Sequence, residues 1–217
     1  MDAVTQRQIA QLEAAGLLSS RRPLLICDVD EVVLHLVAPF EQVLKERGYE
    51  LRTKSFRLTG NVFHMETGQE ATQDDVWSAL EQLFTEQAER QDPVEGAVEA
   101  LNGFAPHIDV MYLTNLPHDF AETRREHMQA LGLHHPLVSN TGSKAPAIGA
   151  MKRERTAFID DTPLNLSQTR DAHPAVHAFH FMADETFRAM VEPIEGVEPS
   201  RANWSDTATA ITKKLLN

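Results

Sequence analysis

Four aspartates stand directly after apolar runs of the sequence, where their chemistry could be used. Asp28 and Asp30 follow the run LLIC, and Asp160 and Asp161 follow the run AFI. Burying one carboxylate is costly, and several carboxylates in one place repel each other unless a cation lies among them. Ligation by oxygen atoms alone is what Mg²⁺ prefers. The pattern therefore predicts a metal-assisted site, provided that the fold brings the two pairs together.

The strands that must position these aspartates alternate with helices along the chain. Apolar runs predict buried strands at 24–27, 109–114, 137–139, 156–160 and 175–181. Such alternation predicts an α/β fold, in which a Rossmann-like parallel sheet has helices on both faces. The carboxyl ends of the strands of such a sheet form the edge where ligands bind. We therefore expect the four aspartates to gather at that edge.

The segment 38–91 interrupts this alternation. Its pattern predicts a helix at 39–47, a hairpin formed by YELRTKSFRL and NVFHME, and a second helix that opens at Thr72 with a capping-box pattern. The second helix has an apolar face made of Val76, Leu80, Leu83 and Phe84. We interpret the segment as a small α+β cap, inserted into a core made of 1–37 and 92–217.

The bulk composition is that of an ordinary globular protein. The 217 residues are 42% hydrophobic and 24% charged, with a formal net charge of -12. This acidity argues against nucleic acid or a membrane as a partner, because both favour a basic face. The single cysteine, Cys27, can form neither an internal disulfide nor a cysteine-built zinc site. The N-terminal sequence lacks a signal-peptide pattern, and the expected location is the cytoplasm.

Each of these signals has an ordinary explanation when it is taken alone. An aspartate after a strand is usually a helix cap or a turn former, and Thr114-Asn115 after the second strand could simply begin a loop. The adjacent His134 and His135 point apart and indicate a loop rather than a metal pair. The conjunction of polar residues at the ends of several apolar runs favours an active site.

Two further groups of polar residues could touch a substrate. His118 and Asp119 closely follow the end of the second strand. Arg52, Lys54 and Arg57 form a basic patch on the predicted hairpin. This basic patch is either a contact for an anionic substrate or a solvated edge that prevents aggregation.

Taken together, these residues resemble the motifs of the haloacid dehalogenase-like (HAD) hydrolase superfamily, in a phosphatase-type member. ICDVDEV resembles the first motif, an apolar strand followed by two aspartates one residue apart, and MYLTN resembles the second, a strand that ends in Thr or Ser. Lys144 fits the third motif, and FIDDTPLN fits the acidic pair of the fourth. The motifs occur in the family's order over about 22–182, apart from the cap.

The resemblance implies a Mg²⁺-dependent phosphatase that acts on a small phosphorylated metabolite through an aspartyl-phosphate. Asp28 would be the nucleophile, and Asp30 would be the general acid and base. Thr114, Asn115 and Lys144 would bind the phosphoryl group, and Thr114 and Lys144 would assist catalysis. The implied metal-binding residues are Asp28, Asp30 through its backbone carbonyl, Asp160 and Asp161.

Several points stay open at the level of the sequence. Many relatives have Gly where this chain has Glu31, and Asn165 falls where many carry a further acid. Lys152 could serve in place of Lys144, which we prefer because Pro146 after it suits the first turn of a helix.

The alternative function is that of a catalytically idle HAD-like protein that binds a phosphorylated ligand or partner. A phosphotransferase such as a mutase is a third option. The intact set of Asp28, Asp30, Lys144 and Asp161 favours the phosphatase. The sequence indicates neither the particular substrate nor the oligomeric state.

Overall fold

The computed structural model describes residues 1–201 and 203–217. In this part of the chain the core is a six-stranded parallel sheet with the strand order β5-β4-β1-β6-β7-β8. The strands are β1 (Leu24–Cys27), β4 (Asp109–Thr114), β5 (Leu137–Ser139), β6 (Thr156–Asp160), β7 (His177–His180) and β8 (Val197–Glu198). Cys27 lies beside Tyr112 and Ile159, so β1, β4 and β6 end at one edge of the sheet. The predicted Rossmann-like α/β fold is confirmed.

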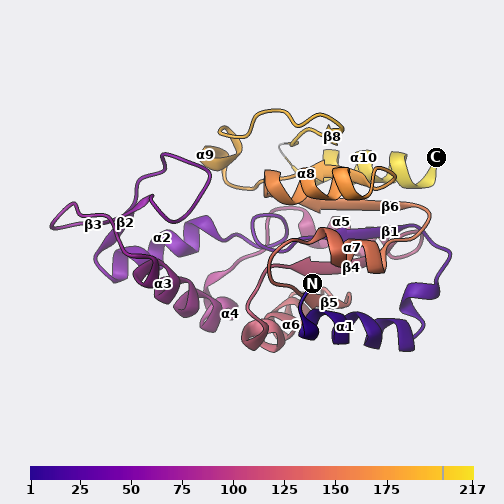
Figure 1. Cartoon of the computed structure of the whole chain (residues 1–217), viewed down its shortest axis with the longest axis horizontal. Coiled ribbons are helices and arrows are strands. Elements are labelled where there is room, and N and C mark those ends of the chain that lie inside the picture. The colour runs from indigo at the N-terminus through magenta and orange to yellow at the C-terminus, as the bar shows by residue number, and fades with distance from the viewer. Residues whose placement is uncertain (202) are drawn as a thin grey trace.

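Helices cover both faces of this sheet (Figure 1). Leu25 and Cys27 of β1 belong to one core cluster, and Leu24 and Ile26 belong to the other. Because successive side chains of a strand point to opposite faces, both faces are buried. The flanking helices are α1 (Ala3–Ala14), α5 (Ala97–Phe104), α6 (Ala121–Ala130), α7 (Ala145–Met151), α8 (Pro163–Ala172), α9 (Glu185–Arg188) and α10 (Trp204–Leu216), with 3₁₀ turns η1 (Leu17–Ser19) and η2 (His118–Phe120).

A smaller α+β unit lies at the end of the molecule beyond the sheet, on the left of Figure 1. It consists of α2 (Val37–Glu46), β2 (Tyr49–Leu51), β3 (Val62–His64), α3 (Gln73–Thr85) and α4 (Gln87–Arg90). Residues such as Phe40, Val43 and Leu83 give the unit a hydrophobic cluster of its own. The capping box at Thr72 and Asp75 is formed as the sequence predicted. This unit is the expected cap, and its boundaries at 38 and 91 stay a prediction.

The hairpin of the cap is shorter than predicted, because β2 and β3 have three residues each and 52–61 forms a loop. The buried Asn61 explains the difference. Its Oδ1 accepts a hydrogen bond from the Lys54 amide at 3.0 Å, and its Nδ2 donates to the carbonyls of Ser55 and Arg57 at 2.8 and 2.6 Å. A side chain that satisfies backbone groups in this way takes the place of a strand ladder.

The pair Asp92-Pro93 is typical of the start of a helix, but α5 begins only at Ala97. The chain at 92–94 pairs with the segment after β1: the His35 amide donates to the Asp92 carbonyl at 3.0 Å, and the Val94 amide donates to the Val33 carbonyl at 2.8 Å. The two connections between core and cap therefore run side by side. Over the described residues, the helices are too short or too polar to cross a membrane.

Candidate active site

Three of the four predicted aspartates meet at the carboxyl edge of the sheet. Asp28 follows β1, Asp160 ends β6, and Asp161 comes next. Each of the three offers a carboxylate oxygen, and these oxygens lie within 4.8 Å of one another. Asp28 and Asp160 are buried, while Asp161 is partly exposed. The topology of the sheet thus produces the cluster that the spacing predicted.

Lys144 lies between two of these carboxylates. Its Nζ is 2.7 Å from Asp28 Oδ1 and 2.7 Å from Asp160 Oδ2, and the side chain is 1% exposed. Burial alone would lower the pKa of Lys144, but Asp160 and Asp28 outweigh this effect and raise the pKa. Lys152 is exposed at the end of α7, with its Nζ 3.4 Å from His173 Nδ1. The structure therefore places Lys144, and not Lys152, at the cluster.

One ammonium group cannot balance three carboxylates. Burial, with help from Asp160 and Asp30 and against the pull of Lys144, raises the pKa of Asp28 to about 7. Burial, followed by the charges of Asp160 and Asp28, raises the pKa of Asp161 well above its usual range. A divalent cation with oxygen ligands would relieve this repulsion. The donor set therefore fits a metal ion.

The contacts of Asp160 show which carboxylates remain free to contact a cation. Besides Lys144 on Oδ2, Asp160 accepts hydrogen bonds on Oδ1 from the Thr162 amide at 2.9 Å and from Asn165 Nδ2 at 3.0 Å. Both of its oxygens are thus engaged with protein donors. Asp28 and Asp161 are the better candidates for direct contact with a cation, and Asn165 stabilises Asp160 instead of adding a further acid.

Thr114 at the end of β4, with Asn115 after β4 and Asn140 after β5, forms the neighbouring polar part of the site. The hydroxyl of Thr114 is buried and has no hydrogen-bond partner among the residues described. Asn115 donates to the Gly142 carbonyl at 2.9 Å, and its Oδ1 accepts a hydrogen bond from Asn140 Nδ2 at 2.8 Å. The unpaired Thr114 hydroxyl is free to donate to an anionic oxygen.

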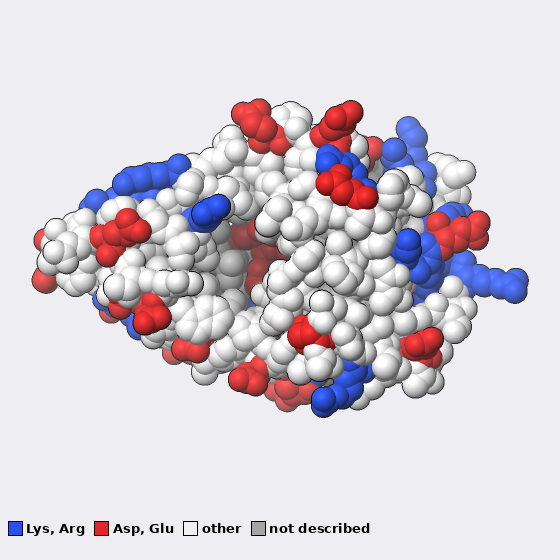
Figure 2. All heavy atoms as spheres, viewed as in Figure 1, with Lys and Arg blue, Asp and Glu red and all other residues white. Residues whose placement is uncertain are grey.

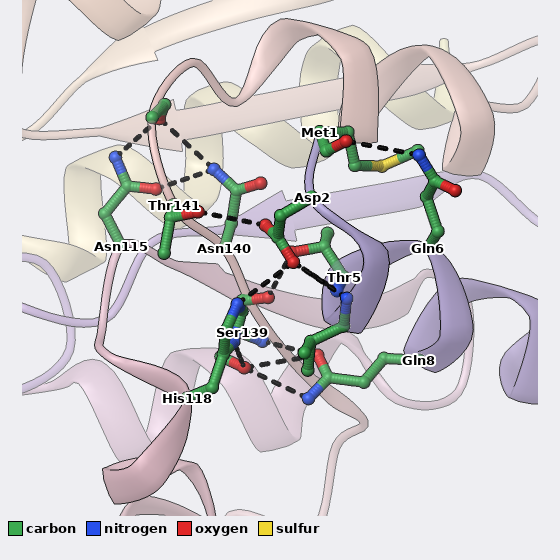
Figure 3. Close-up of polar contacts among 12 residues, drawn as sticks. Met1, Asp2, Thr5, Gln6, Gln8, Asn115, His118, Ser139, Asn140 and Thr141 are labelled. Carbon is green, nitrogen blue, oxygen red and sulfur yellow. Dashed lines mark hydrogen bonds and ion pairs between the residues drawn. The ribbon is translucent and has the colours of Figure 1, made fainter.

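The amino-terminal helix supports this polar part of the site from outside (Figure 3). Asp2 caps α1 and contacts His118 Nε2 at 3.0 Å and Thr141 Oγ1 at 3.0 Å. His118 Nδ1 lies 2.7 Å from Ser139 Oγ, and Thr5 donates to the Ser139 carbonyl at 2.9 Å. His118, which the sequence suggested as a substrate contact, is therefore engaged with α1 and β5.

Asp30 lies apart from the three clustered carboxylates. Its Oδ1 accepts hydrogen bonds from Arg124 Nη1 at 2.9 Å and from Gln91 Nε2 at 3.0 Å. Arg124 is completely buried on α6 and also donates to Gln87 and Gln91. Asp30 still lines the cleft, so its carboxylate is held beside the cluster by residues from the core, the cap and the connection between them.

A cleft of about 590 Å³ opens above these residues, between the core and the cap. Figure 2 shows the hollow, with acidic atoms at its base. Its polar floor includes Asp28, Asp30, Thr114, Asn115, Asn140, Lys144, Asp161 and Asn165. The residues that the cap contributes are Leu58, Trp77, Leu80 and Phe84.

The basic patch does not line this cleft. Arg52 lies over the ring of Phe63 at 4.8 Å and pairs with Glu50, and Lys54 lies over the same ring at 4.3 Å. Arg57 lines a neighbouring cavity. The arrangement favours the interpretation as a solvated edge over that as a substrate contact.

No family model matches the sequence, and no curated protein matches it. Solved structures do match. One is a HAD family hydrolase from Deinococcus radiodurans R1 with bound phosphate and sodium, 14% identical, with a TM-score of 0.58 over 89% of this chain and 96% of that chain. Another is a haloacid dehalogenase-like hydrolase from Streptococcus pneumoniae, 11% identical, with a TM-score of 0.59 over 87% and 98%.

A third match is a protein from Bacillus subtilis, described as a HAD hydrolase and bound to magnesium. It is 13% identical, with a TM-score of 0.58 over 88% of this chain and 99% of that chain. The chain has the HAD-like fold. This finding confirms, at the level of the fold, the resemblance drawn from the four motifs.

Glu31 adopts a backbone conformation that favours glycine, and the structure explains how it does so. Its φ is 58°, in the left-handed region that costs a side-chain-bearing residue about 1–2 kcal/mol. The carboxylate accepts hydrogen bonds from the amides of Leu36 and Val37 at 2.7 Å each and from the Asp184 amide at 2.8 Å. Burial raises the pKa of Glu31, although these amides oppose the shift. These hydrogen bonds offset the backbone strain and fix the conformation of the loop after Asp30, which the sequence alone did not indicate.

Several residues of this site were not predicted from the sequence. Asn140 follows β5 as Asn115 follows β4, so the same strand-end signal could have found it. Arg124, Gln87 and Gln91 carry no such signal, because they come from helix and connection patterns that resemble solvated surface. Their burial depends on how the cap folds back onto α6.

Proposed function

We propose that the protein is a Mg²⁺-dependent phosphatase that hydrolyses a small phosphate monoester through an aspartyl-phosphate on Asp28. The observation that carries the proposal is the placement of Lys144 between Asp28 and Asp160 at the base of a cleft. The neighbours named above, one with bound phosphate and one with magnesium, support it. A cytoplasmic location stays a prediction from the sequence.

In this proposal the main residues of the floor have distinct tasks. The Asp28 carboxylate attacks phosphorus, which forms a P–O bond as the bond to the leaving alcohol breaks. Lys144 offsets the charge of Asp28 and of the phosphoryl group, and the unpaired Thr114 hydroxyl and the backbone at Asn115 hold the phosphoryl oxygens. Asp30 protonates the leaving oxygen and then activates water to hydrolyse the aspartyl-phosphate.

The metal ion has a defined place in the proposal. Asp28, Asp161 and the backbone carbonyl of Asp30 would hold it, with Asp160 beside them. When bound, Mg²⁺ supplies positive charge that stabilises the phosphoryl group during transfer.

Activity should depend on a divalent cation. We expect release of free phosphate from phosphate monoesters to stop in excess EDTA and to return with Mg²⁺, while Ca²⁺ restores it poorly because its coordination shell is larger and looser. The measurement is free phosphate over time, which also separates hydrolysis from transfer to another acceptor. Full activity in excess EDTA would contradict the metal-assisted route. Binding of phosphate esters without release would favour the idle alternative.

Arg124 should act as a positioning residue for Asp30. Arg124→Met removes the donor 2.9 Å from Asp30 Oδ1, and we expect kcat to fall about 10²-fold with little change in KM, because small misplacements of a reacting group have effects of this size. Arg125→Met is the matched control, since Arg125 is partly exposed and pairs with Glu122.

If Arg124 had only a structural role, Arg124→Met would lower the thermal stability without a selective loss of kcat. If Arg124 acts through Asp30, then Arg124→Met should cause little further loss of kcat in the Asp30→Asn background, although it costs about 10²-fold in the wild type. Additive losses, or a loss of kcat explained entirely by unfolded protein in thermal melts, would remove Arg124 from the mechanism.

A further inference from the structure

The wall that the cap presents to the cleft is entirely apolar. Among the described residues of the cap, those that line the cleft are Leu58, Trp77, Leu80 and Phe84. The core contributes three more apolar residues to the lining of the cleft, Leu36, Leu116 and Pro117. The charged side chains that line the cleft all lie on the floor. The cleft therefore has two chemically distinct ends.

The cap offers a leaving group no free polar partner at this wall. The one hydrogen-bond donor among the four cap side chains is the indole of Trp77, and its Nε1 donates to Glu81 Oε1 at 3.0 Å. The basic patch does not line the cleft: Arg52 and Lys54 lie over Phe63, and Arg57 lines the neighbouring cavity. Buried hydroxyl or charged groups of a ligand would lose their hydrogen bonds to water here without replacement.

Trp77 is the most exposed residue of this wall, and Leu58 and Leu80 are partly exposed. Trp77 is 44% exposed. It lies between the cleft and a neighbouring cavity of about 450 Å³. Leu58, Trp77 and Leu80 line both spaces. An apolar ligand in the cleft would cover this surface and remove it from water, which is favourable in proportion to the area covered.

The position of the cap fixes the distance between this wall and the floor. On one side Phe56 packs against Phe187 of α9 with ring centroids 5.7 Å apart, and on the other Phe84 lies 5.8 Å from Phe120. These contacts hold the apolar wall opposite Asp28 and Lys144. A ligand with its phosphate on the floor therefore directs its other end toward Trp77 and Leu80.

We propose that the substrate is the phosphate monoester of an apolar alcohol, aromatic or hydrocarbon, rather than of a sugar or a charged alcohol. This inference rests on the proposed phosphatase activity. Hydrolysis would transfer the phosphoryl group to Asp28 and then to water, and the apolar alcohol would leave with the proton from Asp30. The floor recognises the phosphate, and the cap wall selects the group that leaves.

The first test compares three esters: 1-naphthyl phosphate, n-hexyl phosphate and glucose 6-phosphate. We expect kcat/KM to be at least ~10-fold higher for the two apolar esters than for the sugar ester, the scale on which apolar pockets discriminate. The two apolar esters distinguish an aromatic from a hydrocarbon leaving group. Equal or faster turnover of glucose 6-phosphate would overturn the inference.

The second test removes the wall. Trp77→Ala should reduce the preference for apolar esters over glucose 6-phosphate by about 10-fold, and a change of all three rates by one common factor would count against the inference. Met65→Ala is the matched control on the cap, because Met65 is 54% exposed and lies outside the cleft. The control should keep the wild-type preference.

The third test separates this inference from the proposed activity. Calorimetry with Mg²⁺ would compare benzylphosphonate and methylphosphonate, which are not phosphate esters and give binding without turnover. Binding of benzylphosphonate at least ~10-fold tighter supports the apolar wall even if no ester is hydrolysed, in which case the phosphatase proposal alone fails. Equal affinities would overturn the inference while leaving any observed phosphatase activity in place.

Discussion

Asp28→Asn is expected to lower the rate of phosphate release by at least about 10³-fold, because an amide cannot attack phosphorus as the carboxylate does. The replacement keeps the shape of a buried side chain beside Lys144. The measurement is kcat with a saturating phosphate ester and Mg²⁺. Asp171→Asn is the control, since Asp171 is largely exposed and pairs with Arg170. Near wild-type activity in a pure preparation of Asp28→Asn would remove Asp28 as nucleophile.

The melting temperature of Asp28→Asn, measured without metal at several pH values, is a second and independent test. The pKa of Asp28 is raised to about 7 in the folded protein, so the folded state binds this proton more tightly than the unfolded state. The stability that comes from this proton is present below the unfolded pKa of 3.8 and is lost as the pH rises through 7. The asparagine side chain of the variant does not titrate, so the variant does not lose this stability as the pH rises. The melting temperature of the variant minus that of the wild type should therefore increase from pH 5 to pH 8. A constant difference would show that Asp28 is not strained by burial.

Lys144→Met should damage both stability and activity. The ammonium group pairs with Asp28 and Asp160 at 2.7 Å each, and its removal leaves two buried carboxylates without their counter-charge. Loss of one member of a buried ion pair destabilises by about 3–5 kcal/mol. Urea unfolding measures the stability, and phosphate release in the remaining folded protein measures the activity.

Lys152→Met is the matched control for this variant, because the exposed Lys152 lies at the other end of α7. We expect it to change the free energy of unfolding by less than about 0.5 kcal/mol and to keep full activity. The opposite ranking of the two lysine variants would contradict the assignment of Lys144. Added Mg²⁺ should recover part of the stability lost in Lys144→Met, because a cation can replace some of the missing charge.

The strands and the clustered aspartates could be predicted because their signals are local. LLIC at 24–27 and AFI at 157–159 are continuous apolar runs, as expected for strands buried on both faces. Once these strands are parallel neighbours, the aspartates that follow must share an edge. Cys27 is likewise buried, as its place in the first run indicated.

The parts that could not be predicted depend on contacts between distant segments. Asn61 competes with strand pairing through bonds to a loop whose course the sequence does not reveal. Arg124 is followed directly by the partly exposed Arg125 in α6, and the cap chain that returns at Gln87 and Gln91 accepts hydrogen bonds from the buried Arg124. The basic patch had two interpretations because its partner, the ring of Phe63, lies across a hairpin of uncertain length.

Glu31 has a consequence for the order in which the chain acquires its structure during synthesis. Its carboxylate is completed by the amide of Asp184, which lies 153 residues further along the chain. The neighbour of β1 on one side, β6, also follows late, after the entire cap. Contacts of such long range form slowly, because a long loop must close before they contribute. The connection that joins cap to core thus reaches its final conformation only after residue 184 has left the ribosome, so the early half of the chain emerges with Asp28 at the end of a strand whose neighbour β6 has not yet been made.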